Sequence, residues 1–248
     1  MRTRRTLWLG ALAVLAFVLI ILTRFPAQWV LGFLPRGITC DAVAGTVWNG
    51  ACSGLMVHRQ PLGDLTWIVR PARLLVGRLG AHVELSEAGS YINGDVEVTP
   101  AGTIFAHDVH ANVHLSPAVT PQLPGGLRGT ASADLADVEF RDGRLRELRG
   151  HIEARDLAQT GSGSTALGSY TVAFAGAGAA GALVGELRDL GGPLVVDGTV
   201  RVTPEPGVVV DGKVAARSMA APSLVRQLQV LGPPDAQGRR SFSIADTF

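Results

Sequence analysis

Motifs for catalysis and cofactor binding are missing from this 248-residue sequence. No phosphate-binding loop and no dinucleotide-binding glycine pattern leads from a strand into a helix, so nothing indicates nucleotide binding. The Gly-x-Ser-x-Gly elbow of many hydrolases does not occur, and the carboxylates are scattered over polar strand faces. We therefore expect a protein that is not an enzyme, with no catalytic residues and no cofactor.

An excess of charge of either sign is also lacking, because the formal net charge is only +1. A nearly balanced charge gives no indication of a nucleic acid or another polyanion as partner. Lysine is almost absent, since Lys213 is the only one among 22 lysine and arginine residues. Together with 31 glycines, this usage is typical of a GC-rich bacterial genome.

A long uncharged apolar stretch occurs at the N-terminus, over residues 6–23. As a helix it would measure about 27 Å, close to the roughly 30 Å of a bilayer's hydrocarbon core. Three arginines precede it and only Arg24 follows at once, which predicts a cytoplasmic N-terminus. No small-x-small cleavage site follows, so an uncleaved anchor is favoured over a signal peptide.

The predicted organisation is a cytoplasmic tail (1–5), a single transmembrane helix (6–24) and a periplasmic β-rich domain (25–248). A cluster of prolines and glycines at 116–126 is a candidate subdivision of that domain. The expected location is the inner membrane of a Gram-negative bacterium, with the main domain in the oxidising periplasm.

Alternation of apolar and polar residues dominates the chain after the anchor, as in Leu65, Trp67 and Val69. The phase slips near residue 135, as a β-bulge would cause. Five turn dipeptides occur, some of which are candidates for bulges instead: Asn49-Gly50, Asn93-Gly94, Asp142-Gly143, Asp197-Gly198 and Asp211-Gly212. After the anchor, the clearest predicted helix lies near 221–234, and residues 71–79 are predicted to form a short helix or a loop.

This pattern predicts a mainly β fold, with a curved, mostly antiparallel sheet that is a groove, a barrel or sandwich-like. Its apolar strand faces need a cover, because little helix is available. One such face comprises seven residues: Leu65, Trp67, Val69, Val83, Leu85, Val96 and Val98. An ordinary core is the favoured interpretation of this face, and a lipid-binding groove is the alternative.

The two cysteines, Cys40 and Cys52, are predicted to form a disulfide, because the periplasm permits one. A tight Asn49-Gly50 turn would set Cys52 opposite Val47, so the bond requires either a bend at Gly45-Thr46 or a link between neighbouring elements. Two buried thiols remain the alternative. The Cys-x-x-Cys spacing of redox sites is absent, and two cysteines alone do not make a zinc site.

Three histidines, His107, His110 and His114, resemble a metal motif. On a regular strand His110 and His114 would share the outer face about 13 Å apart, and His107 would point the other way. That distance is too long for one metal ion, so we expect a solvated polar face and no metal site.

Four quoted stretches together resemble a known family: "FPAQWVLGFLP", "VAGTVWNGACSGL", "PLGDLTWIVRPARLLVGRLGAHVEL" and "LVRQLQVLGPPDAQGRRSFSI". The family is protein N of bacterial type II secretion systems, also called general secretion pathway protein N. The block 45–50 with Leu65-x-Trp67 is the most specific part, whereas 100–215 matches only in its short strands and glycines.

The resemblance implies a bitopic inner-membrane component that supports export of folded proteins from the periplasm across the outer membrane. Its partners would be other inner-membrane or periplasmic secretion proteins, its role structural or in assembly, and no catalytic residues are implied. A pseudopilin of the same machine is excluded, because residues 6–23 contain no acidic residue. The alternative is an AsmA-like lipid-handling envelope protein with an apolar groove.

Overall fold

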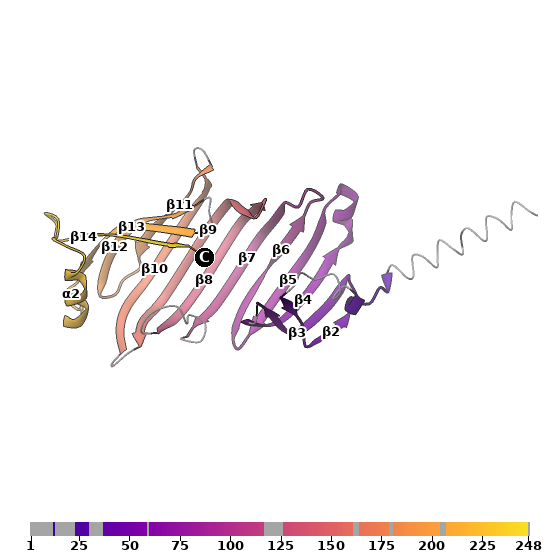
Figure 1. Ribbon diagram of the computed structural model, residues 1–248, viewed down its shortest axis with the longest axis horizontal. Helices are drawn as coiled ribbons and strands as arrows, with labels where there is room; N and C mark the ends of the chain where they lie inside the picture. The colour runs from indigo at the N-terminus through magenta and orange to yellow at the C-terminus, as the bar shows by residue number, and fades with distance from the viewer. Residues whose placement is uncertain are drawn as a thin grey trace, which may run out of the picture. The chain divides into compact units, whose positions relative to one another are not determined.

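The computed structural model describes residue 12 and residues 23–29, 37–58, 60–116, 126–160, 164–178, 181–203 and 207–247. The chain divides into two compact units, residues 1–88 and residues 89–248. The division at residue 88 differs from the candidate subdivision at 116–126, most of which lies outside the described residues. Both units consist of antiparallel strands with little helix, which confirms the mainly β, antiparallel part of the predicted fold (Figure 1).

The first unit is a small antiparallel sheet with the strand order β1-β3-β4-β5, in which β2 also pairs with β3. A six-residue 3-10 helix, η2, joins β4 to β5, so residues 71–79 are partly helical. The elements are β1 (Ile38–Thr39), β2 (Ala42–Gly45), β3 (Asn49–Val57), β4 (Gln60–Arg70), η2 (Pro71–Val76) and β5 (Leu79–Glu87).

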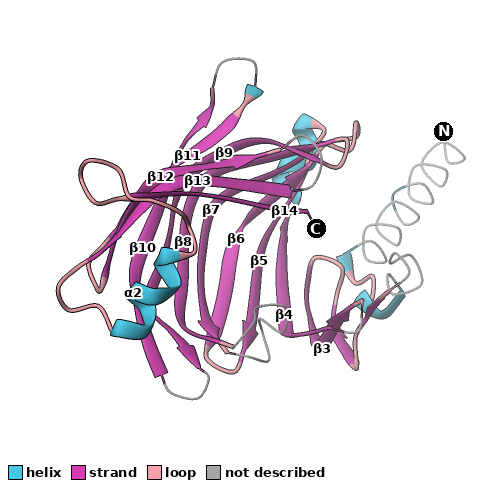
Figure 2. Cartoon of the chain, turned by 60° about the vertical axis from the view of Figure 1, so that its left-hand side comes forward, coloured by secondary structure: helices cyan, strands magenta, loops and turns pink. Residues whose placement is uncertain are grey.

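The second unit is a meander in which each strand from β6 to β13 pairs with the next one. The elements are β6 (Ser90–Val98), β7 (Ile104–Leu115), β8 (Leu127–Arg141), β9 (Arg144–Thr160), β10 (Ser164–Ala177), β11 (Leu183–Asp189), β12 (Leu194–Val202), β13 (Gly207–Ala216), α2 (Pro222–Gln229) and β14 (Arg240–Thr247). Figure 2 shows how strongly this sheet is curved, because β13 and β14 run horizontally in the view whereas β6 and β7 run vertically. Twist and bulges together produce such curvature.

Bulges occur where the alternation slips in the sequence. The pairing of β8 with β9 shifts register between Leu135 and Asp137, as predicted. Asn93-Gly94 also marks a register shift, within β6. Asp142-Gly143 forms the predicted two-residue turn, and both of its residues have positive φ. Asp197-Gly198 and Asp211-Gly212 instead lie inside β12 and β13, where Gly198 pairs with Gly212.

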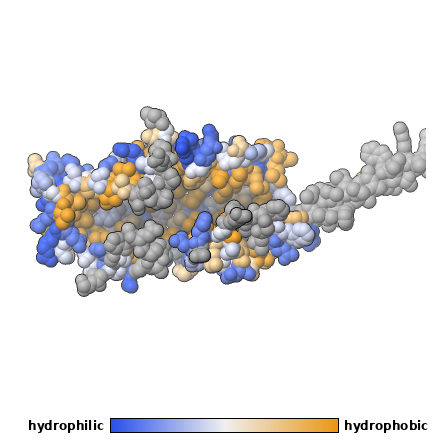
Figure 3. Space-filling model, viewed as in Figure 1, coloured by the Kyte–Doolittle hydropathy of each residue, from blue (hydrophilic) through white to orange (hydrophobic). Residues whose placement is uncertain are grey.

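The core of the second unit lies on one face of its curved sheet, in two clusters. Hydrophobic residues also reach the surface of the molecule, as Figure 3 shows. One cluster contains Val138, Leu148, Phe174 and Leu183, and the other contains Leu194, Val196, Val214 and Leu224. Strand β12 contributes to both, through Val200 and Val202 in the first and Leu194 and Val196 in the second. Residues two apart on a strand share a face, so one apolar face serves both clusters.

Helix α2 covers part of this face, as expected for the only amphipathic helix predicted in the domain. It begins at Pro222, and Leu224 is buried against the strands. The predicted transmembrane helix, 6–24, lies almost entirely outside the described residues. Within the described ranges, no helix is both long and apolar enough to cross a bilayer.

Candidate functional site

Cys40 and Cys52 form a disulfide, with a Cα–Cα distance of 5.7 Å. Cys52 is fully buried on β3 and pairs with Val43 of β2, whereas Cys40 precedes β2. The bond therefore joins neighbouring elements, which was one of the two arrangements the sequence left open. It ties the entry to β2 onto the central strand of the small sheet.

The turn between β2 and β3 has Val47 and Trp48 at its tip, because Gly45 pairs with Gly50 and the Thr46 N–H donates to the Asn49 carbonyl at 2.8 Å. Neither Asn49-Gly50 nor Gly45-Thr46 is the centre of the reversal. Gly45 adopts a φ of +86°, a conformation that favours glycine. The conspicuous sequence block 45–50 is thus the turn itself with its two flanking glycines.

Three hydrogen bonds, two from β4 and one to the entering chain, hold this turn. The Trp67 indole N–H of β4 donates to the Val47 carbonyl at 3.0 Å, and the Val69 N–H donates to the Trp48 carbonyl at 2.7 Å. The Val47 N–H in turn donates to the Phe25 carbonyl at 3.0 Å. The turn therefore connects the segment that follows the predicted anchor to the body of the sheet.

The predicted apolar face is divided between the two units. In the first unit Leu65 pairs with Leu85 and Trp67 with Val83, and Val69 follows two residues along β4. These side chains are half-buried, whereas Thr66, Ile68 and Arg70 between them are exposed. The other two predicted residues, Val96 and Val98, lie on β6 of the second unit.

The histidines of β7 lie in a polar cross-strand network. His107 contacts Asp137 of β8 at 3.0 Å between Nδ1 and Oδ1, and His110 contacts Asp134 at 2.6 Å. The expectation that His107 points away from His110 is wrong. Asp108 between them has a φ of +49°. This irregularity interrupts the alternation of the strand, so the side chains of His107 and His110 lie on the same face.

The network extends onto β9, where Asp134 reaches His151 at 3.3 Å and Asp137 reaches Arg149 at 3.8 Å. His110 and His114 are four residues apart on the strand, as expected, and the His114 N–H is bound by the Ser90 hydroxyl. Among the described residues, no group of three or more histidine, cysteine, aspartate or glutamate residues is arranged to hold a metal ion. The face is a partly exposed set of polar side-chain contacts between histidines, aspartates and Arg149.

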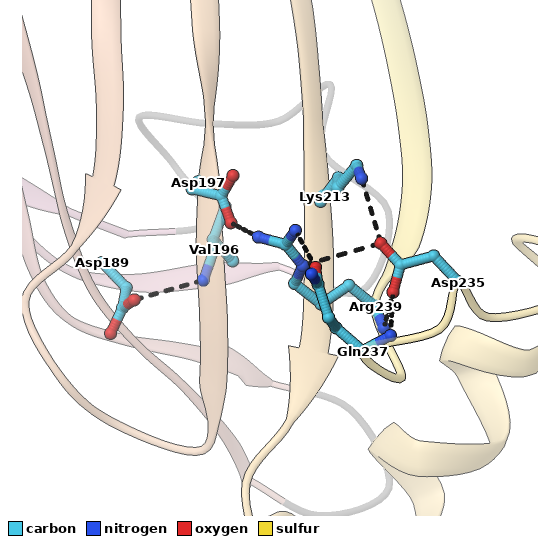
Figure 4. Close-up of polar contacts among 7 residues, drawn as sticks. All are labelled: Asp189, Val196, Asp197, Lys213, Asp235, Gln237 and Arg239. Carbon is cyan, nitrogen blue, oxygen red and sulfur yellow. Dashed lines mark hydrogen bonds and ion pairs between the residues drawn. The ribbon is translucent and has the colours of Figure 1, made fainter.

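A second polar cluster, absent from the sequence predictions, fastens the loop before β14 to β12 and β13 (Figure 4). Asp235 accepts hydrogen bonds from the backbone N–H groups of Arg239 and Gln237 and from Lys213 Nζ. The Arg239 N–H and the Lys213 ammonium lower the pKa of Asp235 to about 2. Arg239 Nη1 also binds Asp197 at 3.1 Å. The Pro-Pro-Asp tripeptide and the Gln-Gly dipeptide of the loop are the turn indicators that the sequence offers here.

A related, partly buried pair lies near the start of β12. Arg217 binds Asp189 at 2.6 Å and also donates to the carbonyls of Gly192 and Leu194. Burial alone would raise the pKa of Asp189, but the hydrogen bond from Arg217, the backbone N–H groups and the guanidinium charge lower it overall. Burial also raises the pKa of the nearby Tyr170 hydroxyl.

An open depression of about 620 Å³ lies over the middle of β12, β13 and β14. Its charged side chains are already engaged: Asp197 with Arg239, Asp211 with the Ser243 hydroxyl, and Lys213 with Asp235. Carboxylates and an ammonium group engaged in this way do not present an activated nucleophile or base. The arrangement supports structural roles for these residues.

Comparison with known proteins gives concordant results. The family model described as "Type II secretion system (T2SS), protein N" matches residues 36–243. Type II secretion system protein N of Vibrio cholerae serotype O1 is similar at 26% identity, over 97% of this chain and 98% of the relative. The same-named protein of Aeromonas hydrophila is also 26% identical, over 93% and 94% of the two chains. No solved structure matches the chain. The match spans the disulfide, strands β1 to β13 and the first half of β14, and the chain therefore belongs to the protein N family of type II secretion systems.

Proposed function

We propose that this chain is a non-enzymatic component of the inner membrane that supports type II secretion through structural or assembly contacts. Its main domain stands in the periplasm, and its partners are other inner-membrane or periplasmic proteins of the secretion system. Family membership over residues 36–243 is the observation on which this proposal depends.

Two further features support the periplasmic placement. The disulfide between Cys40 and Cys52 fits an oxidising compartment, because such bonds persist outside the cytoplasm. The uncharged stretch 6–23, preceded by three arginines, has the length and flanking charge of an anchor with a cytoplasmic N-terminus. The carboxylates described above support a structural role, since they are engaged with neighbouring histidine and arginine side chains.

Deletion of the gene tests the proposal. We expect a folded substrate of the secretion system to accumulate in the periplasm and to fall in the culture medium, and the full chain to restore export. A variant without residues 1–24 should fail to restore it, whereas the domain on an unrelated single-span anchor should succeed. Unchanged export from the deletion strain would refute the secretion role.

The lipid-handling alternative stays a prediction with its own test. It concerns the apolar residues Leu65, Trp67, Val69, Val83, Leu85, Val96 and Val98, proposed as a core or a groove. Mass spectrometry of the purified chain would detect a co-purified lipid in a fixed ratio to protein. If a chain that restores export in the deletion strain is purified without bound lipid, the result would favour the core.

A further inference from the structure

One end of the first unit gathers three segments that are distant in sequence. The Phe25 carbonyl accepts a hydrogen bond from Val47 N–H, and Pro26 pairs with Thr46. The Val69 N–H of β4 binds the Trp48 carbonyl, and η2 begins only two residues later, at Pro71. The entering chain, the 45–50 turn and η2 therefore lie at the same end of the small sheet.

Large apolar side chains at this end face solvent. Within η2, Leu75 is 89% exposed and Val76 is 68% exposed, and Trp29 of the entering chain is 65% exposed. Trp29 also stacks at an angle against Phe25, with ring centroids 6.0 Å apart, while Ala27 between them is buried. The other exposed members are Ile68, Leu74 and Leu79. A run of exposed apolar residues in a connection between strands indicates a contact with another apolar medium.

The charge of this end is of one sign. No acidic residue occurs between Asp64 and Glu84, whereas Arg70, Arg73 and Arg78 flank the apolar residues and are exposed. The acidic side chains lie toward the other end, where Asp64 pairs with Ser86, next to Glu87. Exposed arginines beside aromatic and aliphatic side chains match the interface of a bilayer with anionic lipids.

The short distance between the 45–50 turn and the predicted anchor also favours a contact with the membrane. Phe25, which is hydrogen-bonded to the 45–50 turn, directly follows Arg24, the last residue of the predicted anchor. One residue spans at most about 3.6 Å, so the turn cannot stand more than about 10 Å from the point where the anchor leaves the hydrocarbon. A protein partner at this end would first have to displace the headgroups.

We propose that this end of the first unit rests in the headgroup region of an anionic bilayer, with Trp29 and the η2 residues Leu74, Leu75 and Val76 inserted. The inference rests on the anchoring proposed above and adds a second membrane contact to it. Two contacts would hold the unit at one orientation to the membrane, where a single helix would leave it free to rotate.

The test places a spin label on the full-length chain in liposomes of phosphatidylethanolamine and phosphatidylglycerol. Both native cysteines are engaged in the disulfide, so Leu75→Cys offers one free thiol. Glu87→Cys is the matched control, because Glu87 is exposed at the far end of β5, about 27 Å along the strand from Leu79, where β5 begins after η2. We expect the label at 75 to collide more with dissolved oxygen than with a water-soluble nickel chelate, and the label at 87 to show the reverse.

Equal access of the nickel chelate to both labels would overturn the inference. So would protection of position 75 that appears only after other secretion proteins are added, because that result identifies a protein partner. Failure of the labelled chain to float with the liposomes would refute the anchoring as well. Normal complementation of export by a chain whose label stays aqueous would refute this inference and leave the secretion role intact.

Discussion

At the scale of single residues, Gly50 shows why a small residue is needed beside the turn. A Cβ atom at this position would lie 2.5 Å from the Trp67 ring and 2.9 Å from the carbonyls of Ala44 and Thr46. Those carbonyls belong to the backbone of the turn and cannot easily move. The absence of a side chain at Gly50 therefore leaves room for the Trp67 indole, whose N–H donates to the Val47 carbonyl.

We predict that Gly50→Ala destabilises the protein by about 1–3 kcal/mol through overpacking. Gly178→Ala is the matched control, because Gly178 is exposed, has no positive φ, and the nearest atom to its added Cβ is the Ala182 carbonyl at 3.3 Å. Urea unfolding followed by tryptophan fluorescence measures both. Equal midpoints for the two variants would show that the crowding around Gly50 relaxes at little cost.

Asp235 carries the second prediction at this scale. Its lowered pKa means that its bonds favour the folded state above about pH 4, and this contribution is lost as the pH falls toward about 2. We expect Lys213→Ala to raise this pKa toward its ordinary value, and Lys213→Arg to change it less. Carboxyl ¹³C NMR, with the resonance assigned from Asp235→Asn, follows the titration. An unchanged pKa in Lys213→Ala would mean that the backbone N–H groups of Arg239 and Gln237 lower it without help from the ammonium.

At the scale of elements, α2 forms where the sequence pattern predicted a helix. Pro222 occupies the first turn, where its missing N–H costs nothing, and Leu224 and Leu228 recur at a spacing of four. Their partners, Val196 and Val214, come from β12 and β13. Packing on those strands, and not the propensity of eight residues, stabilises so short a helix.

We predict that Leu224→Ala costs about 2–4 kcal/mol, because it opens a cavity under the helix. Leu224 is 4% exposed, whereas the adjacent Val225 is 39% exposed, so Val225→Ala should cost well under half as much. Thermal unfolding monitored by circular dichroism compares the pair. Similar losses of stability in both variants would show that α2 does not pack on the sheet through Leu224.

At the scale of the whole molecule, stability is expected to differ between the two units. The first unit contains the disulfide and few buried side chains, whereas both core clusters lie in the second. Closing the chain between Cys40 and Cys52 contributes ~3 kcal/mol on the chain-entropy model. Elements with few buried contacts open most readily when a constraint is removed.

We predict that the double variant Cys40→Ser, Cys52→Ser speeds amide hydrogen exchange in β2 and β3 and leaves β12 and β13 unchanged. Mass spectrometry of peptides from the intact chain reports both regions at once. A uniform increase in exchange across both units would show that the whole chain unfolds as one cooperative body.

The alternation of apolar residues, the proline before α2 and the Asp142-Gly143 turn were sufficient to predict a mainly antiparallel β fold with one helix. These features are local, because the side-chain direction along a strand or helix follows directly from backbone geometry. The position of the reversal between the cysteines was not predictable, since it depends on which carbonyl the Trp67 indole reaches across the sheet.

Pairings between distant residues were decided only by the tertiary structure. Gly198 and Gly212 resemble turn glycines in sequence but face each other within strands, and the Asp108 irregularity places His107 beside His110. The bonds of Asp235 with Lys213 likewise bring together residues 22 apart. Register depends on the summed packing of neighbouring strands, which no short stretch of sequence contains, so the sequence determined the elements and the folded sheet determined which of them meet.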